Sequence, residues 1–143
     1  MSITMRAWLS LFLLIAGAAG AFAQTARPAR EICDPKTLSG RPYYLCLEKA
    51  MLDSNRELEA LVSRIYELID SRGDLAAAQR GRWKSSLEEA QILFVRFRNQ
   101  ECQAVAPFEG PNWARVGTFE ERLLCLIDKN IVRRRDLEVR YTK

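Results

Sequence analysis

The chain's four cysteines are the residues whose chemistry constrains its function most, and no histidine accompanies them. The absence of histidine excludes a Ser-His-Asp or Cys-His catalytic arrangement, a histidine-ligated zinc site and c-type haem attachment. The successive cysteine spacings of 13, 56 and 23 residues contain no C-x-x-C pair, which disfavours a redox centre and a zinc site with four thiolate ligands. Paired carboxylates and a nucleophile motif are missing too, so we expect no enzyme activity, cofactor or metal.

The N-terminus decides how the cysteines are interpreted. Residues 1–23 have the features of a signal peptide: a short segment ending in Arg6, an apolar run over residues 7–18, and an A-x-A cleavage site before Gln24. The run is shorter than the roughly 20 residues of a membrane-spanning helix, so an uncleaved anchor is the less favoured alternative. We therefore expect no transmembrane anchor and a mature protein that is periplasmic or secreted.

A largely apolar stripe predicts a first long helix. Over residues 47–68 its members step alternately by four and three, the spacing of one helix face, and the pattern begins at Pro42. Gly73 is the expected helix stop, and Asp74 the expected N-cap of the next helix. The turn at residues 71–73 is too short for anything but an antiparallel hairpin.

Two further helices follow. The same stepping over residues 83–97 predicts a second long helix over about residues 75–105. A loop rich in proline and glycine is expected over residues 106–117. Thr118 and Glu121 then form a capping-box pattern, which predicts the start of the third helix.

These helices place the cysteines together. Cys46 lies near the start of the first helix, Cys102 at the end of the second, and Cys125 about two turns into the third, while Cys33 precedes them all. An even number of cysteines in a small exported domain is typical of two disulfides, each stabilising by about 2–4 kcal/mol. The local pairing of Cys33 with Cys46 and Cys102 with Cys125 is favoured, and the two other pairings stay open.

The patterns together predict an all-α domain. Its expected architecture is a three-helix antiparallel bundle with two long helices, linked by disulfides at one end. The predicted organisation is a signal peptide over residues 1–23, an N-terminal arm over residues 24–41 and a helical domain over residues 42–143.

Without Arg6 the mature chain carries 21 basic and 18 acidic residues, a net charge of +3. A nucleic-acid binder has a denser cationic stripe, so we expect no nucleic-acid partner.

Two stretches carry a family resemblance. The first reads A-Q-x-x-F-x-x-F-R-N-x-E-C over residues 90–102, and the second begins C-L-I-D at residue 125. They resemble the LprI-type lysozyme-inhibitor family of small exported bacterial helical proteins, over roughly residues 33–138. The departures from the family pattern are Phe94 for tryptophan, Asn99 for aspartate and Asn130 for threonine.

The resemblance implies a non-catalytic binding protein that blocks lysozyme or a related glycan hydrolase. Within the motif itself the favoured interpretation is structural. Phe94 and Phe97 fall on the apolar stripe of the second helix. Arg98 and Glu101 are three residues apart and placed either to pair or to cap the end of the helix.

The predicted loop is the candidate binding site. Lysozyme hydrolyses its substrate with two carboxylates, so a blocking loop should offer hydrogen-bond donors or a cation. Asn112, Trp113 and Arg115 supply these, and tryptophan and arginine are enriched at binding hot spots. The alternative is that Trp113 closes the end of the bundle and Arg115 is solvated.

Charge suggests a second functional hypothesis. The C-terminal helix is basic and could attract anionic envelope surfaces or a protein partner, as an accessory protein would; its cations are Arg133, Arg134, Arg135, Arg140 and Lys143. A solvated face is the simpler interpretation.

Because animal-type lysozymes are basic as a class, an inhibitor of lysozyme needs an acidic or neutral contact face. Its candidate acids are Glu88, Glu89, Glu101, Glu109, Glu120 and Glu121.

Overall fold

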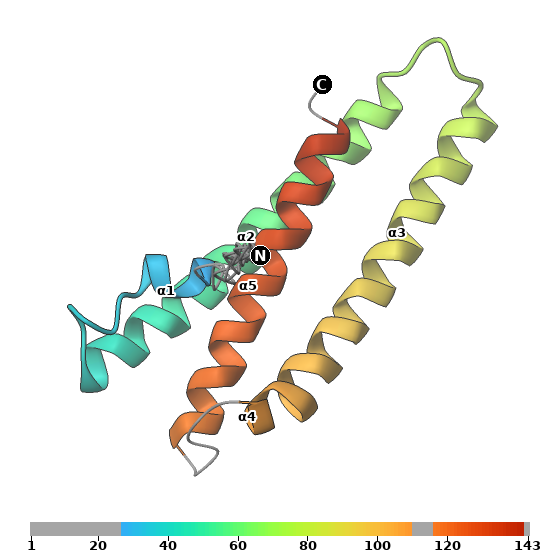
Figure 1. Ribbon diagram of the computed structural model, residues 1–143. Coiled ribbons are helices and arrows are strands. Elements are labelled where there is room, and N and C mark those ends of the chain that lie inside the picture. The colour runs from blue at the N-terminus through green and yellow to red at the C-terminus, as the bar shows by residue number, and fades with distance from the viewer. Residues whose placement is uncertain (1–26, 110–115, 142–143) are drawn as a thin grey trace, which may run out of the picture.

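The computed structural model describes residues 27–109 and 116–141 (Figure 1). The regular structure of this part of the chain is helical, as the sequence predicts. In chain order the elements are α1 (Pro28–Ile32), α2 (Gly40–Asp70), α3 (Ala77–Gln100), the π-helical segment η1 (Glu101–Val105), α4 (Ala106–Glu109) and α5 (Val116–Tyr141). None of these helices combines the length and apolar character needed to span a bilayer. The predicted signal peptide lies outside the described residues.

Helices α2 and α5 lie side by side and run in the same direction (Figure 1). Near their starts the Tyr43 hydroxyl donates to Glu120 Oε1 at 2.9 Å. Further along both helices, Asn130 Nδ2 donates to Ser54 Oγ at 3.0 Å. The apolar stripe of α2 therefore packs against α5 along much of its length, which explains why it extends over so many residues.

The apolar core has two main clusters along this pair. The first lies where α1, α2 and α5 meet and includes Leu47, Leu124 and Ile127, each fully buried. The second lies toward the C-terminal ends of α2 and α5. Its buried members are Leu58, Leu61, Val62, Ile65, Ile69, Leu87 and Leu137.

Helix α3 runs antiparallel to both partners but contributes little to this core. Within α3, which the structure describes in full, Leu87 is the only buried side chain. Trp83 and Phe94 pack against the second cluster, as their place on the predicted stripe implies. Phe97, expected on the same face, is instead 55% exposed, and that prediction is wrong.

The arrangement differs from the predicted bundle in the number of long helices. α2, α3 and α5 have 31, 24 and 26 residues, so there are three long helices where two were expected. Short helices α1 and α4 are added to them. The α2–α3 hairpin is antiparallel as predicted, whereas α2 and α5 are parallel.

The turn between α2 and α3 is longer than predicted. α2 ends at Asp70 and α3 begins at Ala77, so Asp74 is not the N-cap. Its carboxylate instead accepts two hydrogen bonds from the Arg72 guanidinium, at 2.8 and 2.7 Å. The Gln79 side chain accepts the Ala76 N–H at 2.9 Å and satisfies one of the free donors at the start of the helix.

The segment between α3 and α5 also departs from prediction. Residues 101–105 form a π-helical turn and residues 106–109 form α4, so the helical path extends into the predicted loop. α5 begins at Val116, which places Thr118 within the helix and not at its N-cap. This π-helical turn lies where the chain leaves α3 on its way to α5.

Two disulfides are present, and they join consecutive cysteines. Cys33 bonds to Cys46 between α1 and α2, and Cys102 bonds to Cys125 between η1 and α5. Cys33 shares a core cluster with Leu124, the residue next to Cys125. Both disulfides therefore lie toward the end of the molecule where α2 and α5 begin.

The short helix α1 docks on α5 through polar contacts. Arg27 donates to Glu121 at 2.7 Å and to Asp128 at 2.8 Å, and the Ala29 N–H donates to Asp128 at 2.8 Å. Partial burial alone would lower the pKa of Arg27, but its hydrogen bonds to the two carboxylates raise it. Ala29 is fully buried, so residues of the predicted arm form part of the core.

Candidate functional site

A polar cluster joins the three long helices at the family-like motif. Arg98 of α3 donates through Nη1 to Asn55 Oδ1 at 2.9 Å and to Asn130 Oδ1 at 2.7 Å. Its Nε and Nη2 donate to the neighbouring Asn99 Oδ1 at 3.1 and 2.9 Å. One guanidinium thus connects α3 to both α2 and α5.

Asn130 completes this cluster from α5. Its side chain is almost entirely buried, and its amide nitrogen donates to Ser54 Oγ at 3.0 Å and to Asn55 Oδ1 at 2.8 Å. Its amide oxygen accepts from Arg98. A buried amide with all its groups paired rigidifies its surroundings, so this cluster determines how α3 is oriented.

Arg98 is unusual because these acceptors are neutral. The predicted pairing of Arg98 with Glu101 is wrong, since the guanidinium turns to three asparagine side chains instead. Burial lowers the pKa of Arg98, and the charge of Glu59 offsets this effect only in part. The guanidinium stays charged, because arginine has an intrinsic pKa far above neutrality.

Arginines also pack on the aromatic rings of α3. The Phe94 ring lies 5.9 Å from the Arg98 guanidinium and 5.5 Å from that of Arg133. Arg133 Nε further donates to Gln91 Oε1 at 2.9 Å. Lys129 Nζ lies 5.0 Å from the centre of the Phe97 ring, which is otherwise exposed. Phe94 and Arg98 therefore attach α3 to its neighbours, so the expected structural role holds for these two motif residues but not for Phe97 or for an Arg98–Glu101 pair.

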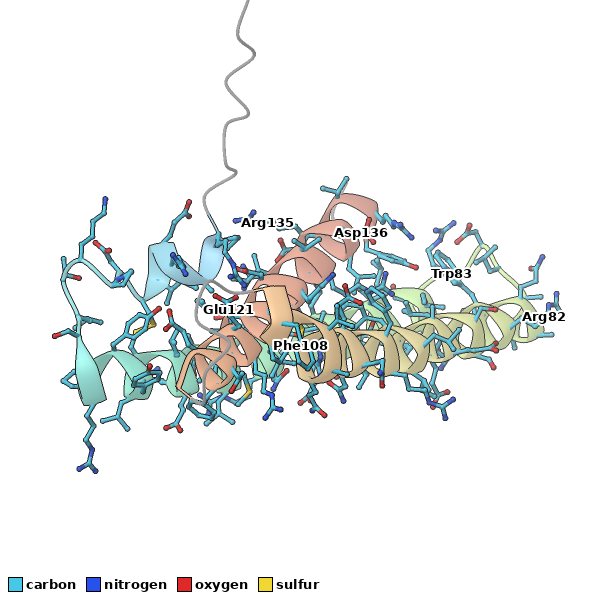
Figure 2. All side chains as sticks on the ribbon, turned by 60° about the horizontal axis from the view of Figure 1, so that its bottom comes forward. Arg82, Trp83, Phe108, Glu121, Arg135 and Asp136 are labelled. Atoms are coloured by element: carbon cyan, nitrogen blue, oxygen red, sulfur yellow. A yellow bond between two sulfur atoms is a disulfide. The ribbon has the colours of Figure 1, made fainter. Side chains whose placement is uncertain are left out.

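The predicted binding residues Asn112, Trp113 and Arg115 lie outside the described residues. The two helices that flank them are described, and the Cys102–Cys125 disulfide joins η1, directly before α4, to α5. Phe108, on α4, is 75% exposed and stands on the surface at this end (Figure 2). Sequence reasoning missed Phe108, although its position beside two prolines and a glycine was a usable signal.

Two of the candidate acids near this end, Glu120 and Glu121, are already paired. Glu121 binds Arg27 at 2.7 Å and lies 3.8 Å from Arg30, between α1 and α5 (Figure 2). Glu120 accepts from Tyr43, and burial together with this contact raises the pKa of Tyr43 to about 12. These two glutamates are therefore not free to contribute to the acidic face that the sequence suggested.

The basic C-terminal helix is also largely paired. Arg133 contacts Asp136 at 3.3 Å, Arg140 contacts Asp136 at 3.0 Å, and Arg134 forms an ion pair with Glu57 of α2. These contacts weaken the case for attraction to anionic surfaces, because paired cations add little net potential. Lys143 lies outside the described residues.

A groove that the sequence did not predict runs between α2 and α3. Its volume is about 510 Å³. The residues around it are Glu59, Val62, Ser63, Glu88, Gln91, Ile92, Val95 and Arg96. The signal in the sequence was that α3 carries apolar residues off its core stripe as well as on it.

Among the described residues, no group of three or more cysteine, aspartate or glutamate side chains is placed to hold a metal ion.

Over its described residues the chain has the fold of a small all-helical protein with two disulfides and an open groove between α2 and α3. The family described as lysozyme inhibitor LprI matches residues 36–137, which is more than half of the chain. The protein therefore belongs to the LprI lysozyme-inhibitor family, a family of non-catalytic inhibitors. Comparison with curated proteins and with solved structures gave no match.

Proposed function

We propose that this protein acts outside the cytoplasm and inhibits a lysozyme, or a related glycan hydrolase, with the segment of residues 108–117. Family membership supports inhibition of this enzyme class. The observation that carries the choice of surface is the Cys102–Cys125 disulfide, which fixes the base of this segment between η1 and α5.

A fixed base favours inhibition for a thermodynamic reason. Association costs conformational entropy whenever a loop must be ordered at the interface, and prior bracing reduces that cost. Exposed Phe108 then serves as an apolar anchor beside the segment. Trp113 is the expected second anchor, and Arg115 is the expected partner for the carboxylates of the enzyme's cleft.

Charge pairing at this end shapes the encounter with a basic enzyme. Glu120 and Glu121 are engaged by Tyr43, Arg27 and Arg30, so long-range attraction contributes little. Binding therefore depends on short-range contacts of the aromatic and cationic side chains. Inhibition should accordingly vary little with ionic strength, because screening acts mainly on long-range charge interactions.

The test is a turbidity assay of cell-wall lysis by lysozymes of different types, with the purified mature protein. The double variant Trp113→Ala/Arg115→Ala and the single variant Phe108→Ala should each weaken inhibition at least about tenfold, as expected for hot-spot residues. Phe97→Ala and Arg135→Ala are the matched controls, since both residues are exposed and lie elsewhere.

Two results distinguish a failure of the proposed binding segment from a failure of the proposed function. Inhibition that survives all the loop substitutions would reject the segment and leave the family function intact. A wild-type protein that inhibits no lysozyme or related hydrolase would reject the function itself. Removal of the Cys102–Cys125 disulfide should weaken inhibition more than removal of the Cys33–Cys46 disulfide, because only Cys102–Cys125 fixes the base of the segment.

A further inference from the structure

Helix α3 presents an apolar surface that no other part of the described structure covers. Ile92 is 47% exposed and Leu93 is 56% exposed, and Val95 is exposed as well. At about 100° per residue, Ile92 points away from the side on which Phe94 meets Arg133. This surface is continuous with the groove between α2 and α3, where Val62 of α2 contributes further apolar lining.

The charged residues of α3 itself on this surface are acidic before Ile92 and basic after it, while Glu59 of α2 also lines the groove. Glu88 and Glu89 lie about 5–6 Å before Ile92 along the helix axis, and Arg96 lies about 6 Å after it. In the described part of the chain none of these three forms an ion pair, whereas most of the arginines of α5 do. The surface therefore offers unpaired charges of both signs around an apolar centre.

Such a pattern is complementary to itself. When two identical helices pack antiparallel about a two-fold axis, the segment before the axis in one copy faces the segment after it in the other. With the axis near Ile92, Arg96 of each copy comes level with Glu88 and Glu89 of its partner. The two Ile92 side chains then meet at the centre, beside the grooves that both copies contribute.

We propose that this face of α3 is the interface of a homodimer, in which the α3 helices of two copies pack antiparallel about a two-fold axis near Ile92. The occupant of the groove is thus a second copy of this chain. The interface buries Ile92 and Val95 and pairs Arg96 with the opposite acids twice, since every contact of a two-fold interface occurs in both directions. This inference is independent of the proposed inhibition.

The test is analytical ultracentrifugation of the mature protein over a wide concentration range. Arg96→Glu places like charges together at both ends of the interface and should raise the dimer dissociation constant roughly tenfold or more. Ile92→Glu introduces a charge at the centre and should raise it roughly a hundredfold. The triple variant Glu88→Arg/Glu89→Arg/Arg96→Glu exchanges the two signs and should restore dimerisation to within about threefold of wild type.

The matched control is Arg82→Glu, the same charge change on the same helix. Arg82 lies at the far end of α3, away from Ile92 (Figure 2), so this substitution should leave the dissociation constant unchanged. Circular dichroism of each variant verifies that the helices remain. A protein that is monomeric at every concentration would overturn the proposal. A dimer that Arg82→Glu weakens as much as Arg96→Glu does, or that the triple variant fails to restore, would overturn it too.

Discussion

The α2–α5 pair and helix α3 are held in the molecule by different kinds of contact. Along the pair, fully buried aliphatic side chains such as Leu47, Leu124 and Ile127 form the core. α3 buries one leucine and packs the partly buried Trp83 and Phe94 against the second cluster. Its other attachments are hydrogen bonds and the arginines that lie over the Phe94 ring. Burial of apolar side chains stabilises the fold but does not depend on the direction of the contact, whereas hydrogen bonds to asparagines require defined angles and so fix the orientation of the helix. The pair thus stabilises the fold, and the polar cluster positions the third long helix on it.

The largest expected loss of stability follows a substitution in the core between α2 and α5. Leu124→Ala removes a fully buried side chain from the first core cluster, and the lost transfer free energy plus the cavity should lower the free energy of unfolding by about 2–5 kcal/mol. Urea denaturation of the oxidised protein measures this change. Val132→Ala is the control on the same helix, because Val132 is exposed. Equal losses for the two variants would show that the pair is not the stabilising core.

A smaller loss is expected at the attachment of α3. Asn130→Ala leaves the side chains of Arg98, Ser54 and Asn55 short of partners, and unsatisfied polar groups should lower the free energy of unfolding by about 1–3 kcal/mol. Hydrogen exchange should show greater opening of α3 than of α2. Uniform opening of all helices would mean that the cluster stabilises the whole fold and not this one helix.

The smallest effect concerns pH at the end where α2 and α5 begin. The pKa of Tyr43 is about 12 in the folded protein, against an ordinary value of 10. Because the folded pKa is the higher one, the contribution of the protonated hydroxyl is complete below pH 10 and is lost as pH rises from about 10 to 12. Denaturation midpoints over this range should fall more steeply for wild type than for Tyr43→Phe. Parallel curves would contradict the buried Tyr43–Glu120 contact.

The pair was far easier to predict from the sequence than α3 was. The apolar stripe of α2 is regular, and the cysteine count together with the signal-peptide pattern leads to two disulfides. Periodicity identifies which residues share a face of a helix, but it does not say how closely a neighbour covers that face. For this reason Phe94 was placed correctly and Phe97 was not.

The polar cluster could not be predicted for a different reason. Arg98 lies 43 residues from Asn55 and 32 residues from Asn130, and no local rule connects such positions. The sequence instead offered the nearby Glu101, which the helix geometry also allows. The binding role of Asn112, Trp113 and Arg115 remains a prediction, because these residues lie outside the described part of the chain.

The order of the two disulfides along the chain has a consequence for biogenesis. The first cysteine bonds to the second and the third to the fourth, and both members of the first pair, 13 residues apart, precede the second pair along the chain. Oxidation in the order of emergence then gives the native connectivity directly. A chain oxidised in that order needs no reshuffling of mispaired sulfurs.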